Sequence, residues 1–255
     1  MTSNRSTVDP ALEMIGATKF YGTTRGLKNC TFAVPAGTVC ALVGRNGSGK
    51  TTALKVAAGL IELDEGSVKV NSSPMQFGGI APVSYVAQTK SLYPSLKVLE
   101  IIRYASALAL GEFDESLAVE WVAEHGIPLD QRLGTLSGGQ RTQVALATAL
   151  GRNVSVIVLD EPMADLDPIA RDLVANRLIE LSKSGRTILV SSHAVSELSG
   201  FCNYIVVLKK GDAILSSWVK DIVVSQPLDR VVLDLLRADS DSPGVAQINS
   251  EKEPS

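Results

Sequence analysis

The octapeptide Gly44-Arg45-Asn46-Gly47-Ser48-Gly49-Lys50-Thr51 fits the pattern G-x-x-x-x-G-K-[ST] and points to the class of fold. The apolar run VCALV precedes it, and a helical pattern follows from Thr51 to Leu60. A glycine-rich turn between a strand and a helix lets backbone N–H groups point at phosphate oxygens, and the helix N-terminus adds a positive dipole end. The sequence therefore predicts a binding site for nucleotide phosphates.

The residues of this loop have separate expected roles. Lys50 reaches the β- and γ-phosphates, the Thr51 hydroxyl is a ligand for Mg²⁺, and Thr52 donates to a further phosphate oxygen. The phosphate cradle itself is expected from Gly44, Asn46, Gly47, Ser48 and Gly49. The motif alone leaves an ATPase, a GTPase and a small kinase open.

A second apolar strand, VIVLD, ends in two adjacent carboxylates, Asp160 and Glu161. Ligands of open α/β sheets bind at the carboxyl ends of the strands. Asp160 is expected to hold Mg²⁺, which is the Walker B role, and Glu161 to accept a proton from the attacking water. The alternative is that these acids are only solvated residues at the end of a strand. That is common for a single acid, but much less common for two adjacent acids in a chain that also carries a phosphate loop.

The pentapeptide Leu136-Ser137-Gly138-Gly139-Gln140 discriminates most strongly between classes. Ser137 is a good helix N-cap, and the glycines allow an anion to approach the backbone closely. Between a phosphate loop and an acid-ended strand, this segment is typical of the ABC signature. The chain thus resembles the ATP-binding subunit of an ABC transporter, from about Glu13 to Leu215.

The resemblance implies roles for further residues. Tyr21 would stack on adenine, Gln88 would contact the Mg²⁺ ion and link the site to the helical subdomain, and His193 would contact the γ-phosphate. Ser137, Gly139 and Gln140 would close over the ATP of a second subunit. Asp165 to Asp167 match the D-loop. The implied catalytic set is Lys50, Gln88, Glu161 and His193, the implied cofactors are ATP and Mg²⁺, and the implied metal ligands are Thr51, Gln88 and Asp160.

The resemblance also implies the architecture: an α/β P-loop NTPase (RecA-like) core with an antiparallel β subdomain and an inserted α-helical subdomain. The core is expected over residues 12–88 and 152–220, and the helical subdomain with the signature over 89–151. A loose N-terminus (1–11), a short helical extension (221–237) and a disordered tail (238–255) complete the expected division.

The composition of the chain limits the classes of partner that it can bind. The chain has 255 residues, with 24 Lys plus Arg against 27 Asp plus Glu, so its net charge of −3 gives no field for nucleic acid. Three scattered cysteines indicate buried free thiols. No apolar run is long enough to span a membrane. The resemblance to an ATP-binding subunit, in a chain without such a run, implies two kinds of partner: a second copy of the chain and separate permease subunits. It also implies that the chain is cytoplasmic and peripheral on the inner face of the membrane.

The resemblance is to ATPases of bacterial exporters of the antibiotic and multidrug type, because of the stretch from Asp160 to Pro168 and the short segment after Leu215. The alternative is a stand-alone cytosolic ABC ATPase of the assembly-factor or translation-associated type. A regulatory nucleotide-binding module is a third possibility, against which the full catalytic set argues. The transported substrate is not encoded in this chain.

Overall fold

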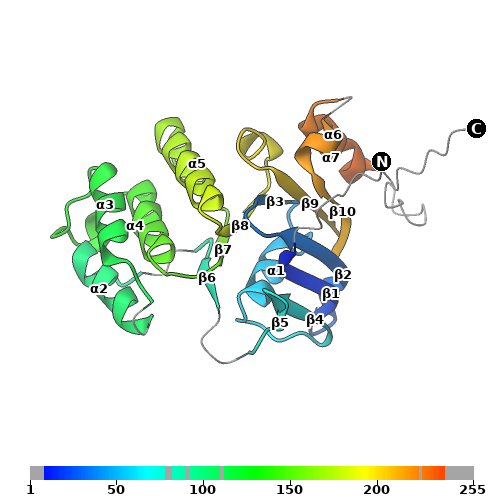
Figure 1. Ribbon diagram of the computed structural model, residues 1–255, viewed down its shortest axis with the longest axis horizontal. Coiled ribbons are helices and arrows are strands. Elements are labelled where there is room, and N and C mark those ends of the chain that lie inside the picture. The colour runs from blue at the N-terminus through cyan, green and yellow to red at the C-terminus, as the bar shows by residue number, and fades with distance from the viewer. Residues whose placement is uncertain (1–8, 78–81, 90–91, 110–111, 224–225, 239–255) are drawn as a thin grey trace, which may run out of the picture.

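Two β-sheets and a separate group of helices make up the structure, a computed structural model that describes residues 9–77, 82–89, 92–109, 112–223 and 226–238 (Figure 1). The larger sheet has six strands in the order β10-β9-β3-β8-β7-β6. All neighbouring strands in it are parallel except β9 and β10. The strands are β3 (Val39–Val43), β6 (Val83–Val86), β7 (Val156–Asp160), β8 (Thr187–Ser192), β9 (Tyr204–Lys209) and β10 (Asp212–Trp218).

The smaller sheet is antiparallel and has the strand order β2-β1-β4-β5. Its strands are β1 (Pro10–Tyr21), β2 (Thr24–Pro35), β4 (Glu65–Val70) and β5 (Ser73–Pro74). β1 begins at Pro10, so residues 10 and 11 do not belong to a loose N-terminus: Ala11 is buried in the core and Pro10 pairs with Pro35.

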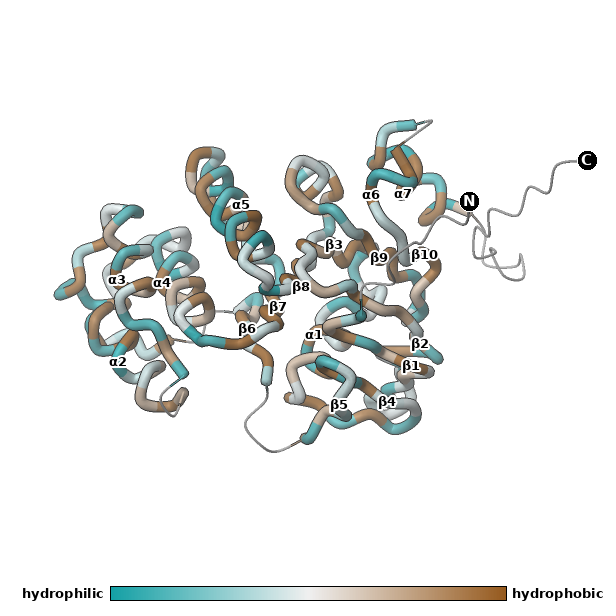
Figure 2. The backbone as a smooth tube through the Cα atoms, in the orientation of Figure 1, coloured by the Kyte–Doolittle hydropathy of each residue, from teal (hydrophilic) through white to brown (hydrophobic). Residues whose placement is uncertain are grey.

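Helices cover both faces of the six-stranded sheet, which explains its continuous apolar strands. All residues of β3, β7 and β8 are buried. Helix α1 (Lys50–Ala57) and the smaller sheet pack on one face, whereas α5 (Pro168–Lys183) packs on the other. Figure 2 shows hydrophobic residues along the central strands and alternating character along α5.

The helical part comprises α2 (Val98–Leu108), α3 (Glu115–Glu124), the 3₁₀ helix η1 (Leu133–Thr135) and α4 (Gly138–Leu150). Trp121 of α3 is buried and its Nε1 donates to the Gln143 carbonyl of α4 at 3.1 Å. His125 is the C-cap residue of α3, and its ring lies against the Trp121 ring, so it has a structural place in this part of the fold. These helices lie within residues 89–151, the range expected for the helical subdomain.

The C-terminal part holds the 3₁₀ helix η2 (Val195–Glu197), α6 (Val219–Ile222) and α7 (Leu228–Arg237). The single extension expected over 221–237 is therefore two helices, with Pro227 at the start of α7. Helix α7 packs against η2, and Lys209 donates to the Leu235 carbonyl near the C-terminal end of α7. Residues 1–8 and 239–255 lie outside the described part of the chain.

β9 and β10 form a hairpin that turns at Lys210 and Gly211, with both residues at positive φ (51° and 85°), as a type I′ turn requires. The Trp218 ring at the end of β10 meets the Tyr204 ring edge to face, with centroids 5.4 Å apart. The structure contains, within the described ranges, no helix that is both long enough and apolar enough to cross a membrane.

Candidate nucleotide site

The predicted phosphate loop joins β3 to α1 and can be formed only with glycine at two of its positions. A Cβ on Gly44 would lie 2.4 Å from the Leu208 carbonyl oxygen, and one on Gly49 would lie 2.5 Å from the Gly26 carbonyl oxygen. Gly49 also has φ of 103°, which L side chains rarely adopt. The turn between β9 and β10 contacts the phosphate loop, since Gly211 N–H donates to the Ser48 carbonyl at 3.0 Å.

Lys50 opens α1 with 7% of its surface exposed, and its Nζ donates to the Gly44 carbonyl at 2.8 Å. Burial lowers the pKa of Lys50, while the negative charges of Glu161 and Asp160 raise it by less. The fold therefore brings the lysine of the loop and the two predicted carboxylates close enough for their charges to interact.

Three of the predicted catalytic residues meet at one oxygen atom. Gln88 Nε2 donates to Glu161 Oε2 at 3.1 Å, and His193 Nδ1 lies 3.5 Å from the same oxygen. They come from the segments after β6, β7 and β8, so parallel strands deliver them to one edge of the sheet. Glu161 has a positive φ of 48°, which is uncommon for a residue other than glycine.

Ser191 was not predicted as a site residue, yet it lies at the centre of this edge. Its Oγ donates to Asp160 Oδ1 at 2.7 Å and accepts a hydrogen bond from Glu161 N–H at 3.0 Å. Ser191 has no exposed surface, and Asp160 has 1%. The sequence feature that could have pointed to Ser191 is the pair of serines directly before His193, at the end of a mostly apolar strand.

The residues present fit a magnesium nucleotide. Among the described residues, Ser48 Oγ and Asp160 Oδ2 are buried with no hydrogen bond assigned to them. The Tyr85 side chain lies near Asp160, and burial together with that carboxylate raises the pKa of Tyr85. Magnesium prefers oxygen ligands and is commonly held by one or two carboxylates together with substrate phosphates. The predicted ligands Thr51, Gln88 and Asp160 offer that donor set. Among the described residues, no group of three or more His, Cys, Asp or Glu is placed to hold a metal ion.

The signature residues Ser137, Gly139 and Gln140 lie away from the phosphate loop of their own chain. Ser137 and Gln140 form a capping box at the start of α4, with hydrogen bonds of 3.2 Å and 3.0 Å. A Cβ on Gly139 would lie 3.1 Å from the Asp165 carbonyl, so the signature borders the D-loop of its own chain. Figure 1 shows α4 and α1 well apart. Among the described residues, no backbone hydrogen bond links these two helices.

Two further predicted residues lie at the edges of the site. Tyr21 is 47% exposed, and its ring borders Gly26, where a Cβ would meet both Tyr21 Cε2 at 2.8 Å and Thr52 Oγ1 at 3.0 Å. The Tyr21 ring and the first turn of α1 therefore face a common space. Asp167 caps α5 by accepting from Ala170 N–H at 2.9 Å.

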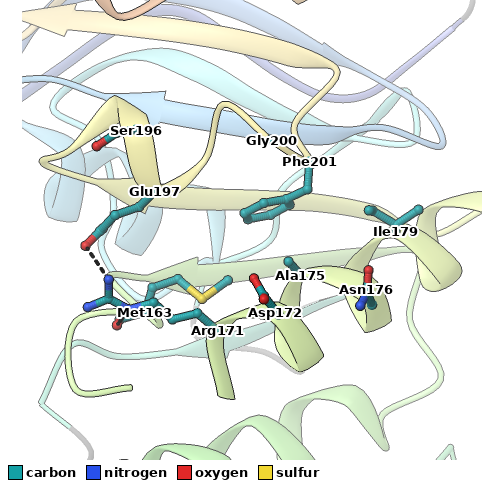
Figure 3. A pocket seen from close by; sticks show the side chains of 10 residues that line it. All are labelled: Met163, Arg171, Asp172, Ala175, Asn176, Ile179, Ser196, Glu197, Gly200 and Phe201. Carbon is teal, nitrogen blue, oxygen red and sulfur yellow. Dashed lines mark hydrogen bonds and ion pairs between the residues drawn. The ribbon is translucent and has the colours of Figure 1, made fainter. Parts of the chain in front are cut away.

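A cavity of about 440 Å³ lies between α5 and η2, on the face of the six-stranded sheet that is opposite to α1 (Figure 3). At one end Arg171 pairs with Glu197 at 3.8 Å, and Arg171 Nε donates to the Met163 carbonyl at 3.2 Å. Glu197 in turn accepts from Ser192 Oγ at 2.7 Å. These contacts tie the segment after Glu161 to the residues that flank His193.

Comparison with known proteins agrees with this geometry. The family described as "ABC transporter" matches residues 27–164. The chain is 34% identical over 218 residues to the aliphatic sulfonates import ATP-binding protein SsuB 2 of Agrobacterium fabrum, which covers 84% of this chain and 82% of that protein. It is 33% identical over 203 residues to the Nod factor export ATP-binding protein I of Burkholderia thailandensis, covering 77% and 67%.

A solved structure described as the dimeric post-hydrolysis state of the ATP-binding cassette MJ0796, bound to ADP and Pi, has the same fold. Its TM-score is 0.71 at 23% identity, and the match covers 82% of this chain and 98% of that one. This likeness agrees with the α/β fold that the strand order defines here.

The chain belongs to the ABC transporter family, in which it is an ATP-binding subunit and an ATPase. The expected resemblance to exporters of antibiotics is not supported, because the relatives are named for import as well as export.

Proposed function

We propose that this chain binds and hydrolyses ATP to power a membrane transporter. The observation that carries the proposal is the meeting of Gln88 and His193 at the Glu161 carboxylate, in the same chain as a loop whose Gly44 and Gly49 leave no room for a side chain. Each of these side chains comes from a different strand end, so the arrangement depends on the whole sheet.

The residues of the chain divide the chemistry among them. The N–H groups of the loop and the Lys50 ammonium bind the phosphates, and the Tyr21 ring lies where a base can stack. Thr51, Gln88 and Asp160 would hold Mg²⁺, which neutralises charge on the transferred phosphoryl group. Glu161 accepts the proton of the attacking water, and His193 orients the γ-phosphate.

We also propose that two copies close over two ATP molecules, head to tail. The exposed Ser137 and the start of α4 lie apart from the phosphate loop of their own chain, so they are free to face the loop of another. A helix N-terminus aimed at a γ-phosphate is favourable, and losing that phosphate removes the contact. The dimeric cassette with the same fold supports this assembly.

The membrane partner would be a separate permease that docks beside Gln88. A hollow of about 310 Å³ there extends from Gln88 to the signature, and it is lined by Gln88, Leu92, Pro94, Gly138, Arg141 and Asp165. Tyr93 and Tyr104 are exposed beside it, with ring centroids 6.0 Å apart. Large exposed aromatic side chains next to a hollow are typical of a surface that another protein covers.

Export of an antibiotic-, drug- or peptide-type cargo is a separate proposal, which rests only on the stretch from Asp160 to Pro168 and on the short segment after Leu215. The relatives add no support to it. Transport assays in inside-out vesicles that contain the chain and its permease give the direction, and accumulation of cargo inside such vesicles would indicate export.

The test of the proposed function starts with the purified full-length chain. We expect ATP binding by calorimetry, phosphate release that requires Mg²⁺, and co-purification from its native cells, in mild detergent, with one polytopic membrane protein in comparable amount. That protein should change the rate of phosphate release when both are reconstituted. Co-purification with soluble complexes only would favour the stand-alone ABC ATPase, and absence of ATP binding would refute both functions.

A further inference from the structure

We propose that Ser191 is a positioning residue for ATP hydrolysis: its hydroxyl holds Asp160 and Glu161 in a fixed relation to each other. The inference rests on the proposed function and extends it to a residue to which that function gave no part. It depends on the position of Ser191 in the sheet, on its hydrogen bonds, and on the backbone of Glu161.

The sheet determines where the Ser191 side chain points. β8 lies between β3 and β7, and Ser191 is in register with Leu42 on one side and Asp160 on the other. Side chains alternate along a strand, so Ser191 shares a face with Leu189, which packs in the core beneath α1. Ser192 faces the opposite side, where it donates to Glu197.

The Ser191 hydroxyl bonds to both carboxylate residues at once. It donates to the Asp160 carboxylate at 2.7 Å and accepts from the Glu161 N–H at 3.0 Å. The bond to Asp160 is charge-assisted and therefore stronger than a neutral one. Because Ser191 has no exposed surface, water cannot take over these bonds in a variant without enlarging the site.

The backbone of Glu161 explains why such an anchor is needed. Its φ of 48° lies in the left-handed region, which is unfavourable for a side chain with a Cβ. Residues in that region persist only where surrounding contacts hold them. The bond from Glu161 N–H to Ser191 is such a contact, and it sets the direction in which the Glu161 carboxylate leaves the strand toward Gln88 and His193.

The proposal predicts a specific pattern of effects. Removing the hydroxyl leaves the phosphate loop and Tyr21 unchanged, so ATP affinity without Mg²⁺ should stay the same. The Asp160 carboxylate should lose its fixed orientation, which reduces the gain in ATP affinity that Mg²⁺ provides. Glu161 should be misdirected, which lowers kcat far more than it changes KM.

The experiment compares Ser191→Val and Ser191→Thr, whose side chains have nearly the same shape but differ in the hydroxyl. Ser191→Ala adds no volume to the buried position and tests the proposal if the larger residues prevent folding. The matched control is Thr187→Val, which removes a buried hydroxyl from the other end of the same strand, where Thr187 Oγ1 accepts from Gly37 N–H at 3.0 Å.

In the full-length chain, we expect Ser191→Ala and Ser191→Val to lower kcat about tenfold or more, with KM for ATP changed less than about threefold. Ser191→Thr should recover most of the rate. Calorimetry with ATP in EDTA and in Mg²⁺ should show a smaller Mg²⁺-dependent gain for Ser191→Ala than for the wild type, and this readout needs no hydrolysis. Thr187→Val should match the wild type in both measurements.

Two results would overturn the proposal: a Ser191→Ala chain with wild-type kcat and Mg²⁺-dependent gain, or a Thr187→Val chain that loses as much as Ser191→Ala. The second would show that any buried hydroxyl of β8 has the same general effect. A wild-type chain that binds no ATP would instead refute the proposed function itself, so the two failures are distinguishable.

Discussion

Gln88 Nε2 donates a hydrogen bond to Glu161 Oε2 at 3.1 Å, across 73 residues of sequence. Gln88 follows β6, and the chain continues from it into the helical part, whereas Glu161 directly follows β7. The general base of the proposed reaction is therefore held by the residue that leads to the surface where a permease would dock. A shift of the helical part would move the amide and alter the environment of the base directly.

The first prediction concerns Glu161→Gln, which keeps the shape of the side chain but removes its basicity. We expect kcat to fall about a hundredfold or more, because a positioned general base contributes about 10²–10⁴-fold. ATP binding should be retained. Phosphate release and calorimetry measure the two effects, and Glu124→Gln on the exposed side of α3 is the matched control. A near-wild-type rate in Glu161→Gln would remove Glu161 from the role of base.

The second prediction is that Lys50→Ala loses most of its affinity for ATP. The Lys50 ammonium is buried at the loop and is the cation that the phosphates would meet there. Lys55→Ala, one and a half turns further along α1, serves as the control for a general loss of positive charge. Unchanged ATP binding by calorimetry in Lys50→Ala would contradict the assignment.

The third prediction is a pH dependence of stability that originates at Lys50. Burial lowers its pKa in the folded chain, so the unfolded chain binds more protons between that pKa and the ordinary value of 10.5. The contribution of Lys50 to the free energy of unfolding should therefore rise with pH in that window, without nucleotide. Urea unfolding of the wild type and Lys50→Met at several pH values tests this, and equal slopes for both chains would contradict it.

The fourth prediction separates two roles of Ser137. As the N-cap of α4 it should contribute about 1 kcal/mol to stability, as should Asp114, the N-cap of α3. Ser137→Ala and Asp114→Ala should therefore show similar decreases in melting temperature. In a Glu161→Gln background, only Ser137→Ala should weaken the dimer that forms with ATP, measured by light scattering. Equal dimerisation in both variants would speak against a contact between Ser137 and the ATP of the partner.

The fifth prediction is that the native chain resists alkylation of its thiols. Cys30, Cys40 and Cys202 are all free and buried. Burial raises the pKa of Cys30 to about 12, and it raises the pKa values of Cys40 and Cys202 as well. Thiolates are the reactive form, so iodoacetamide at pH 8 should modify the folded chain slowly and the unfolded chain at three sites. Mass spectrometry after timed quenching measures this.

Local patterns in the sequence predicted the parts of the fold that depend on neighbouring residues. The phosphate loop, the buried strands before Glu161 and His193, and the hairpin at Lys210-Gly211 each have a signal within about ten residues. The strand pairings that bring Gln88 and Glu161 together have no such signal. They follow from the order of six strands, to which distant segments contribute.

Ser191 shows why part of the site escaped prediction. Its sequence context is that of a strand end, and serine alone has many roles. Only its register opposite Asp160 gives the hydroxyl a function. The early start of β1 at Pro10 has a similar cause, because that segment is held by pairing with β2 and not by its own polar sequence.

The placement of the two tryptophans gives the chain an intrinsic optical reporter for each of its two parts. Trp121 is buried between α3 and α4, and Trp218 meets Tyr204 at the end of the six-stranded sheet. In a Trp218→Phe chain, the remaining indole emission arises from the helical part alone. Stopped-flow fluorescence of that variant would follow the movement of this part during ATP turnover without any attached dye.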